Sequence, residues 1–192
     1  MWLLLTALSM PNMMAEGDGG KDKDKMMVEL RSLSARFYVA TENIDSAQAF
    51  GMCDSMEYYY NELDGDKDLS RANAQYCRVY YCLVTKRFVK AKKLFGEMKE
   101  YNSTDPTIAT YFYTAWMNYV AFMRMENRVY EAFDECRQMR RYALDRKDDF
   151  GLAYSYMITG DCFSYSTDVA MDNYKKSHDL FVKMKMQRIV ID

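Results

Sequence analysis

Apolar residues recur every three or four positions along nearly the whole chain after Lys25, as they do on one face of an α-helix. The clearest run follows Asp105 and Pro106, which suit the N-cap and the first turn of a helix. Its apolar members are Ile108, Tyr111, Phe112, Ala115, Trp116, Tyr119, Val120 and Met123. A second run starts after a connection of only three residues, 125–127. So short a connection predicts two antiparallel helices that lie side by side.

The same layout recurs along the chain and predicts an all-α fold without a sheet. Eight helices are expected, in four antiparallel pairs: 25–41 with 44–63, 69–84 with 87–101, 106–125 with 128–146, and 149–163 with 168–186. Turn-forming residues separate them at 63–68, 102–106 and 146–149. The chain has only two prolines in 192 residues, which also favours helices over an all-β fold.

An internal repeat becomes visible when the second helices of the four pairs are aligned. Each carries a small residue near its start, and these are Ala47, Ala91, Ala132 and Ala170. A bulky residue follows four positions later, as Phe95 does after Ala91, although the first repeat has Gly51 there. A repeat of about 40 residues with one helical hairpin per repeat is typical of a solenoid.

Two segments resemble the tetratricopeptide family. Segment 84–98, VTKRFVKAKKLFGEM, is similar to the second half of its motif through Phe88, Ala91 and Phe95, and segment 151–163 is similar to a first helix through Gly160. The resemblance covers residues 26–186 and implies a right-handed α-solenoid of about four antiparallel hairpins. The repeats are longer than the family's usual length of about 34 residues, and the closing proline is missing. Such elongated repeats resemble those of bacterial regulators and of sensor regions in bacterial two-component proteins.

The N-terminal segment has the character of an export signal. Residues 2–10 are apolar but too few to span a bilayer, and the small residue Ala15 precedes a polar stretch. We therefore expect a signal peptide at 1–15, a flexible linker at 16–25, and an exported, periplasmic repeat domain at 26–186. No basic segment precedes the apolar run, so the alternative is a cytoplasmic protein that begins with an apolar helix.

Composition excludes some partners. The net charge is −2, which gives no basic excess for nucleic acid. The five cysteines lie among apolar residues of expected helices, without a C-x-x-C pair, at Cys53, Cys77, Cys82, Cys136 and Cys162. We expect them to be buried thiols, with one disulfide as the alternative.

No catalytic, cofactor or metal site stands out. His178 is the only histidine, so a two-histidine metal site cannot form within one chain. The string around it, SHDLF, has a passing likeness to the phosphoacceptor box of histidine kinases, but Val182-Lys183-Met184 replaces the expected continuation. Nothing marks a nucleophile for a triad, and we expect no enzyme.

An aspartate cluster follows the second expected helix. Asp64, Asp66 and Asp68 alternate as in a calcium-binding loop, but Leu69 stands where such a loop requires glycine. Gln75 stands where the bidentate glutamate belongs. We therefore expect a solvated turn.

Stacked hairpins form a concave surface lined by the first helix of each pair. Residues with side chains typical of contact surfaces lie on two of these helices, and the candidate partner groove consists of Asn73, Tyr76, Tyr80, Thr114, Met117 and Arg124. The alternative is that the same stripes belong to the core.

The expected function is a non-catalytic scaffold that binds a protein or peptide, as the sensory region of an exported bacterial signalling protein. The alternative is a cytoplasmic adaptor or transcriptional-regulator module. At the other end, Leu180 and residues 189–191 are apolar and follow the last expected helix. We expect this end to lack a cap and to drive self-association, unless residues 187–192 fold back over it.

Overall fold

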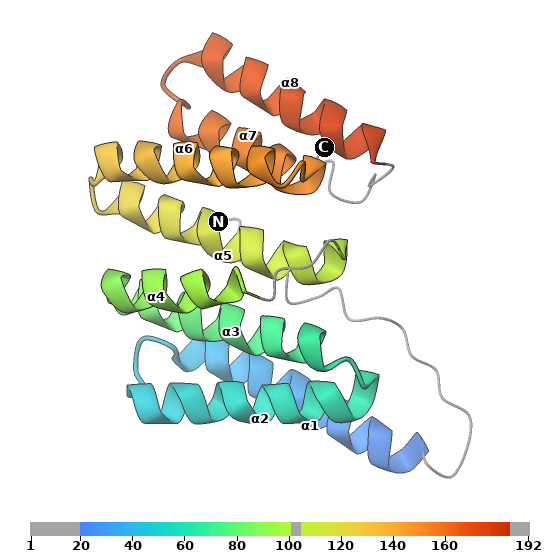
Figure 1. Ribbon diagram of the computed structural model, residues 1–192. Coiled ribbons are helices and arrows are strands. Elements are labelled where there is room, and N and C mark those ends of the chain that lie inside the picture. Colours follow the sequence, from blue (N-terminus) through green and yellow to red (C-terminus); the bar gives the residue numbers. More distant parts are fainter. Residues whose placement is uncertain (1–19, 101–104, 185–192) are drawn as a thin grey trace. The chain divides into compact units, whose positions relative to one another are not determined.

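The computed structural model describes residues 20–100 and 105–184, and every regular element in these ranges is an α-helix (Figure 1). The eight helices are α1 (Gly20–Ala40), α2 (Ser46–Asp64), α3 (Lys67–Val84), α4 (Phe88–Met98), α5 (Pro106–Met125), α6 (Val129–Asp145), α7 (Asp149–Cys162) and α8 (Thr167–Lys183). The predicted all-α class is therefore confirmed for the part of the chain that the structure describes. None of these helices combines the length and the apolarity needed to cross a membrane.

The chain divides into two compact units, and the division falls inside α3, between Ala74 and Gln75. In the first unit, α1 and α2 pack against each other. Leu33 and Phe37 on α1 and Cys53 and Met56 on α2 are buried there. The Ser34 hydroxyl also donates a hydrogen bond to the Met56 sulfur, at 3.4 Å.

The connection from α2 to α3 is built by turn chemistry. Gly65 ends α2 in the left-handed conformation, with φ 75°, which suits a residue without a side chain. The Asp66 carboxylate accepts hydrogen bonds from the backbone N–H groups of Asp68 and Leu69, at 3.0 and 2.9 Å. Asp66 thus caps α3, and the aspartate cluster forms an exposed turn, as expected.

The second unit contains the rest of α3 and helices α4 to α8. Each of its helices contacts helices that are next to it in the sequence, or one further along, as α5 does with α4, α6 and α7. The core is rich in aromatic residues. Trp116 of α5 stacks on Phe95 of α4, with ring centroids 5.5 Å apart, and contacts Tyr142 of α6 edge-on.

Three connections in this unit end the preceding helix in the same way. Lys86, Asn127 and Lys147 each have a positive φ, between 53° and 60°. The next backbone N–H reaches back five residues, as Arg128 does to the Met123 carbonyl at 2.9 Å. This pattern is a Schellman motif, which satisfies the last carbonyls of a helix. The motif ends one helix and lets the next begin after only a few residues, which accounts for the short connections.

Two glycines of α7 allow close packing. A Cβ added to Gly151 would lie 2.1 Å from the Tyr113 hydroxyl of α5, and one added to Gly160 would lie 2.6 Å from the Tyr174 ring of α8. The expectation that Gly160 is a crossing position is therefore confirmed. Alanines at the other predicted crossings, Ala91 and Ala132, are fully buried.

The first repeat differs from the sequence alignment. Ala47 is exposed, whereas Ala49 is fully buried, and the residue four positions beyond it is the buried Cys53. The small crossing residue of α2 is thus Ala49, and the assignment of Ala47 was wrong by two positions. With this register, Gly51 lies on the exposed side, where no bulky residue is needed.

The ends of the chain show further differences. Helix α1 begins at Gly20, so residues 20–25 are helical although the sequence placed them in a linker. Leu180 is half-buried on α8. The expected signal peptide at 1–15, the apolar residues 189–191 and the tail 187–192 lie outside the described residues.

Candidate functional site

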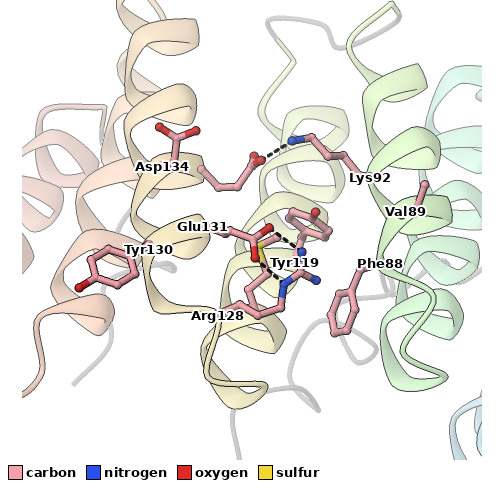
Figure 2. A pocket seen from close by; sticks show the side chains of 10 residues that line it. Phe88, Val89, Lys92, Tyr119, Arg128, Tyr130, Glu131 and Asp134 are labelled. Atoms are coloured by element: carbon pink, nitrogen blue, oxygen red, sulfur yellow. Dashed lines mark hydrogen bonds and ion pairs between the residues drawn. The ribbon is translucent and has the colours of Figure 1, made fainter.

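A groove opens in the second unit where α4 and α6 both lie against α5 (Figure 2). It has a volume of about 490 Å³, which is within the usual range of binding pockets. Three helices contribute its lining side chains: Phe88, Val89 and Lys92 from α4, Tyr119 and Met123 from α5, and Arg128 with Tyr130, Glu131, Asp134 and Glu135 at the start of α6.

The connections before α4 and α6 are alike. Each helix starts directly after a Schellman turn and an arginine, and the first turn of each contributes side chains to the groove. The two turns are also joined by an ion pair, in which the Lys86 ammonium lies 2.8 Å from the Glu126 carboxylate. The first turns of α4 and α6 therefore form the two walls of the groove, and α5 forms its floor.

A buried carboxylate closes one end of the groove. Glu135 has only 3% of its surface exposed. It accepts a hydrogen bond from the Lys92 ammonium at 2.6 Å and one from the Trp116 indole N–H at 2.9 Å. A charge can stay buried only when it is paired in this way. The hydrogen bond to Glu135 raises the pKa of Lys92 above its usual value, so this lysine stays charged.

A second ion pair borders the groove. The Arg128 guanidinium donates two hydrogen bonds to the Glu131 carboxylate, at 2.8 and 2.6 Å. The same guanidinium lies over the Phe88 ring, 5.0 Å from its centre, and so links α6 to α4. The hydrogen bond from Arg128 lowers the pKa of the Glu131 carboxyl below its usual value, so this pair is charged at neutral pH.

Apolar side chains stand uncovered on both walls. Val89 on α4 is 88% exposed and Tyr130 on α6 is 90% exposed. Tyr119 and Met123 form a well-packed floor between them, and burial raises the pKa of the Tyr119 hydroxyl so that it stays protonated. The lining contains two cations and three carboxylates, so the groove is slightly acidic. The arrangement offers apolar contact flanked by charges that are already paired.

The six residues expected to form the partner groove lie elsewhere. Tyr76 is buried and its hydroxyl accepts a hydrogen bond from the Asn118 amide at 3.1 Å. Arg124 donates to the Ser164 hydroxyl at 3.4 Å. The other four are half-buried: Asn73, Tyr80, Thr114 and Met117. None of the six lines the groove between α4 and α6, and a binding role for them stays a prediction.

Sequence reasoning missed the groove because it lies between the second helices of two pairs. One signal was available. Glu135 follows Ala132 by three positions and precedes Met139 by four, so helical spacing places this charged residue on the buried face of α6. A charged group on a buried face needs hydrogen-bond partners, and for Glu135 these are Lys92 and Trp116.

The histidine, the cysteines and the possible metal ligands lie in the following surroundings. The side chain of His178 is 53% exposed and its Nδ1 lies 3.5 Å from the carboxylate of its neighbour Asp179. All five cysteines are buried thiols. Among the described residues, no group of three or more histidines, cysteines or carboxylates is gathered as a metal site would require.

Comparisons with family models, with curated proteins and with solved structures find no match to this chain.

Proposed function

We propose that this chain is a non-catalytic scaffold that binds a protein or peptide in the groove between α4 and α6. The observation that supports it is the exposure of one apolar side chain on each wall, Val89 on α4 and Tyr130 on α6, at the borders of a groove with a packed floor. When a partner covers the exposed valine and tyrosine side chains, their apolar surface is removed from water, which favours binding. The charged groups of the lining already have partners, so they frame the groove rather than stand ready as an acid or a base.

The chemistry of the lining defines the partner. The exposed side chains of Val89 and Tyr130 offer apolar contact at the borders of the groove. The half-exposed carboxylates of Glu131 and Asp134 favour a basic residue next to that contact. We therefore propose a peptide segment with an apolar residue flanked by lysine or arginine.

The proposal extends to the architecture. The recurring small residues, Schellman turns and hairpins support a right-handed solenoid of the tetratricopeptide kind, with the groove formed between successive repeats. In this view the chain is the sensory or interaction region of an exported bacterial signalling protein. The alternative is a cytoplasmic adaptor or regulator module, in which the same groove would serve.

Peptide display against the whole chain tests the binding proposal. Peptides selected on the wild-type protein should share an apolar residue next to a basic one. Val89→Asp and Tyr130→Asp should each weaken their binding at least about tenfold, because each replaces apolar contact surface of the groove with a charge. Tyr165→Asp is the matched control, since Tyr165 is 74% exposed but lies outside the groove. Selected peptides that bind all three variants as well as wild type would contradict the proposal.

A further inference from the structure

Two cysteine sulfurs face each other between α6 and α7. The Sγ atoms of Cys136 and Cys162 are 3.6 Å apart, although the residues are 26 positions apart in the sequence. Both side chains are almost fully buried, with 3% and 4% of their surfaces exposed. The two sulfurs need to move only a short way toward each other to reach the length of a disulfide bond, about 2.05 Å.

The surroundings distinguish the two sulfurs. The Cys136 thiol hydrogen bonds to Cys162, which together with burial raises the pKa of Cys136. The contact with Cys136 lowers the pKa of Cys162 and the positive charge of Arg124 acts in the same direction, whereas burial raises it. Arg140 lies near Cys136 and the carboxylate of Asp161 lies near Cys162. Of the two, Cys162 has the lowered pKa and is therefore assigned the role of the attacking thiolate.

We propose that Cys136 and Cys162 are a modification site, at which oxidation by a peroxide joins α6 to α7 through a disulfide. The site is independent of the groove and of its proposed partner.

The reaction takes two steps. The Cys162 thiolate attacks one oxygen of hydrogen peroxide, the O–O bond breaks, and Cys162 becomes a sulfenic acid while hydroxide leaves. The Cys136 thiol then gives up its proton and its sulfur attacks the Cys162 sulfur, which displaces the second hydroxide as water. Overall, two thiols lose two electrons and two protons, and one peroxide becomes two molecules of water. Hydrogen peroxide suits a buried pair because it is little larger than water.

The other cysteines provide an internal comparison. Burial raises the pKa of the Cys82 thiol, which keeps it protonated and slow to react. The α6–α7 pair, by contrast, places a second sulfur 3.6 Å from the first. Oxidation should therefore select the α6–α7 pair.

Peptide mapping of the wild-type chain tests the proposal directly. The folded protein is treated with hydrogen peroxide, denatured in an alkylating agent and digested with trypsin. Tryptic cleavage releases Cys136 in peptide 129–137 and Cys162 in peptide 148–175, each with a single cysteine. The expected result is one linked species of these two peptides, less two hydrogen atoms, that separates on treatment with dithiothreitol. Oxidised methionines add oxygen and are distinguished by mass.

Three outcomes would overturn the proposal: both thiols fully alkylated after peroxide, sulfinic acid at Cys162 without a link, or a link to another cysteine. Cys136→Ala and Cys162→Ala should abolish the linked species, and Cys82→Ala should retain it as the matched control. The oxidised wild-type chain should also melt several degrees higher than the reduced one, because the bond closes a loop in the unfolded chain. The peptide map decides the question even if one of the variants fails to fold.

Discussion

Glu135 shows how a single residue links the core to the groove. Its two carboxylate oxygens are shared between Lys92, which reaches the solvent, and the indole of the buried Trp116. The pair is thus half exposed. When the carboxylate is removed, the Lys92 ammonium can form hydrogen bonds with water, but the buried Trp116 N–H cannot reach water.

The expected cost of Glu135→Ala follows from that asymmetry. A buried donor without an acceptor costs about 1–3 kcal/mol, and the free energy of unfolding should fall by about that amount. Glu135→Gln keeps an acceptor for Trp116 and should cost less. Denaturant titration of both variants measures the difference. Glu131→Gln is the control on the exposed pair and should change stability by less than about 0.5 kcal/mol. Equal stability of Glu135→Ala and wild type would show that Trp116 has another partner.

Lys147 carries a backbone conformation that suits a different residue. Its φ of 53° is left-handed, and its side chain is exposed. A residue with a Cβ pays about 1 kcal/mol in this conformation, whereas glycine does not. Lys147→Gly should therefore stabilise the chain by about 0.5–1 kcal/mol, as read from thermal or denaturant unfolding. Asn127→Gly, at the equivalent position, should gain less because asparagine tolerates this conformation. A loss of stability in Lys147→Gly would mean that this turn is not formed.

At the scale of the element, α7 packs against three helices, α5, α6 and α8. Tyr113, which faces Gly151, is fully buried and packs against Phe150 and Tyr154 of α7 as well as Phe112 of its own helix. Such a ring has little room to move. Tyr174, which faces Gly160, is only half-buried, and its hydroxyl donates a hydrogen bond to Asp161 at 2.6 Å.

Glycine-to-alanine changes should therefore have opposite effects in different helices. Gly151→Ala should lower the free energy of unfolding by about 1–3 kcal/mol, because the overpacking exceeds the gain in helix propensity. Gly160→Ala should cost less than Gly151→Ala. Gly96→Ala in α4 meets nothing within 4 Å and should instead stabilise by up to about 1 kcal/mol. Thermal unfolding of the three variants checks the order, and a stabilising Gly151→Ala would contradict the α5–α7 packing.

The helices were largely predictable because residues close in the sequence, such as capping residues, determine where each helix begins and ends. Asp105 and Pro106 set the start of α5, and the structure places that helix at Pro106–Met125, as the spacing predicted. The register of α2 was not predictable in the same way. Ala47 and Ala49 are both small, and only contact with other helices decides that Ala49 is the buried one.

At the scale of the whole chain, the sequence predicted the all-α class, which the structure confirms for the described residues, but not the groove. A groove depends on how side chains from three helices meet, and the residues concerned are ordinary for helix surfaces when each is considered alone. Val89 and Tyr130 have no unusual neighbours in the sequence. They become notable only when the structure shows both exposed at the borders of one groove.

The pattern of helix contacts in the second unit has a consequence for how fast it assembles. Because each helix meets helices adjacent in the sequence or one further along, few long loops must close before packing begins. Chains of this kind fold within microseconds to milliseconds, and α-helical contacts can form before distant ones are needed. Stopped-flow refolding monitored by Trp116, which is buried among these helices, should therefore show a dominant phase complete within milliseconds. A dominant phase lasting seconds would mean that pairing between distant segments limits the rate.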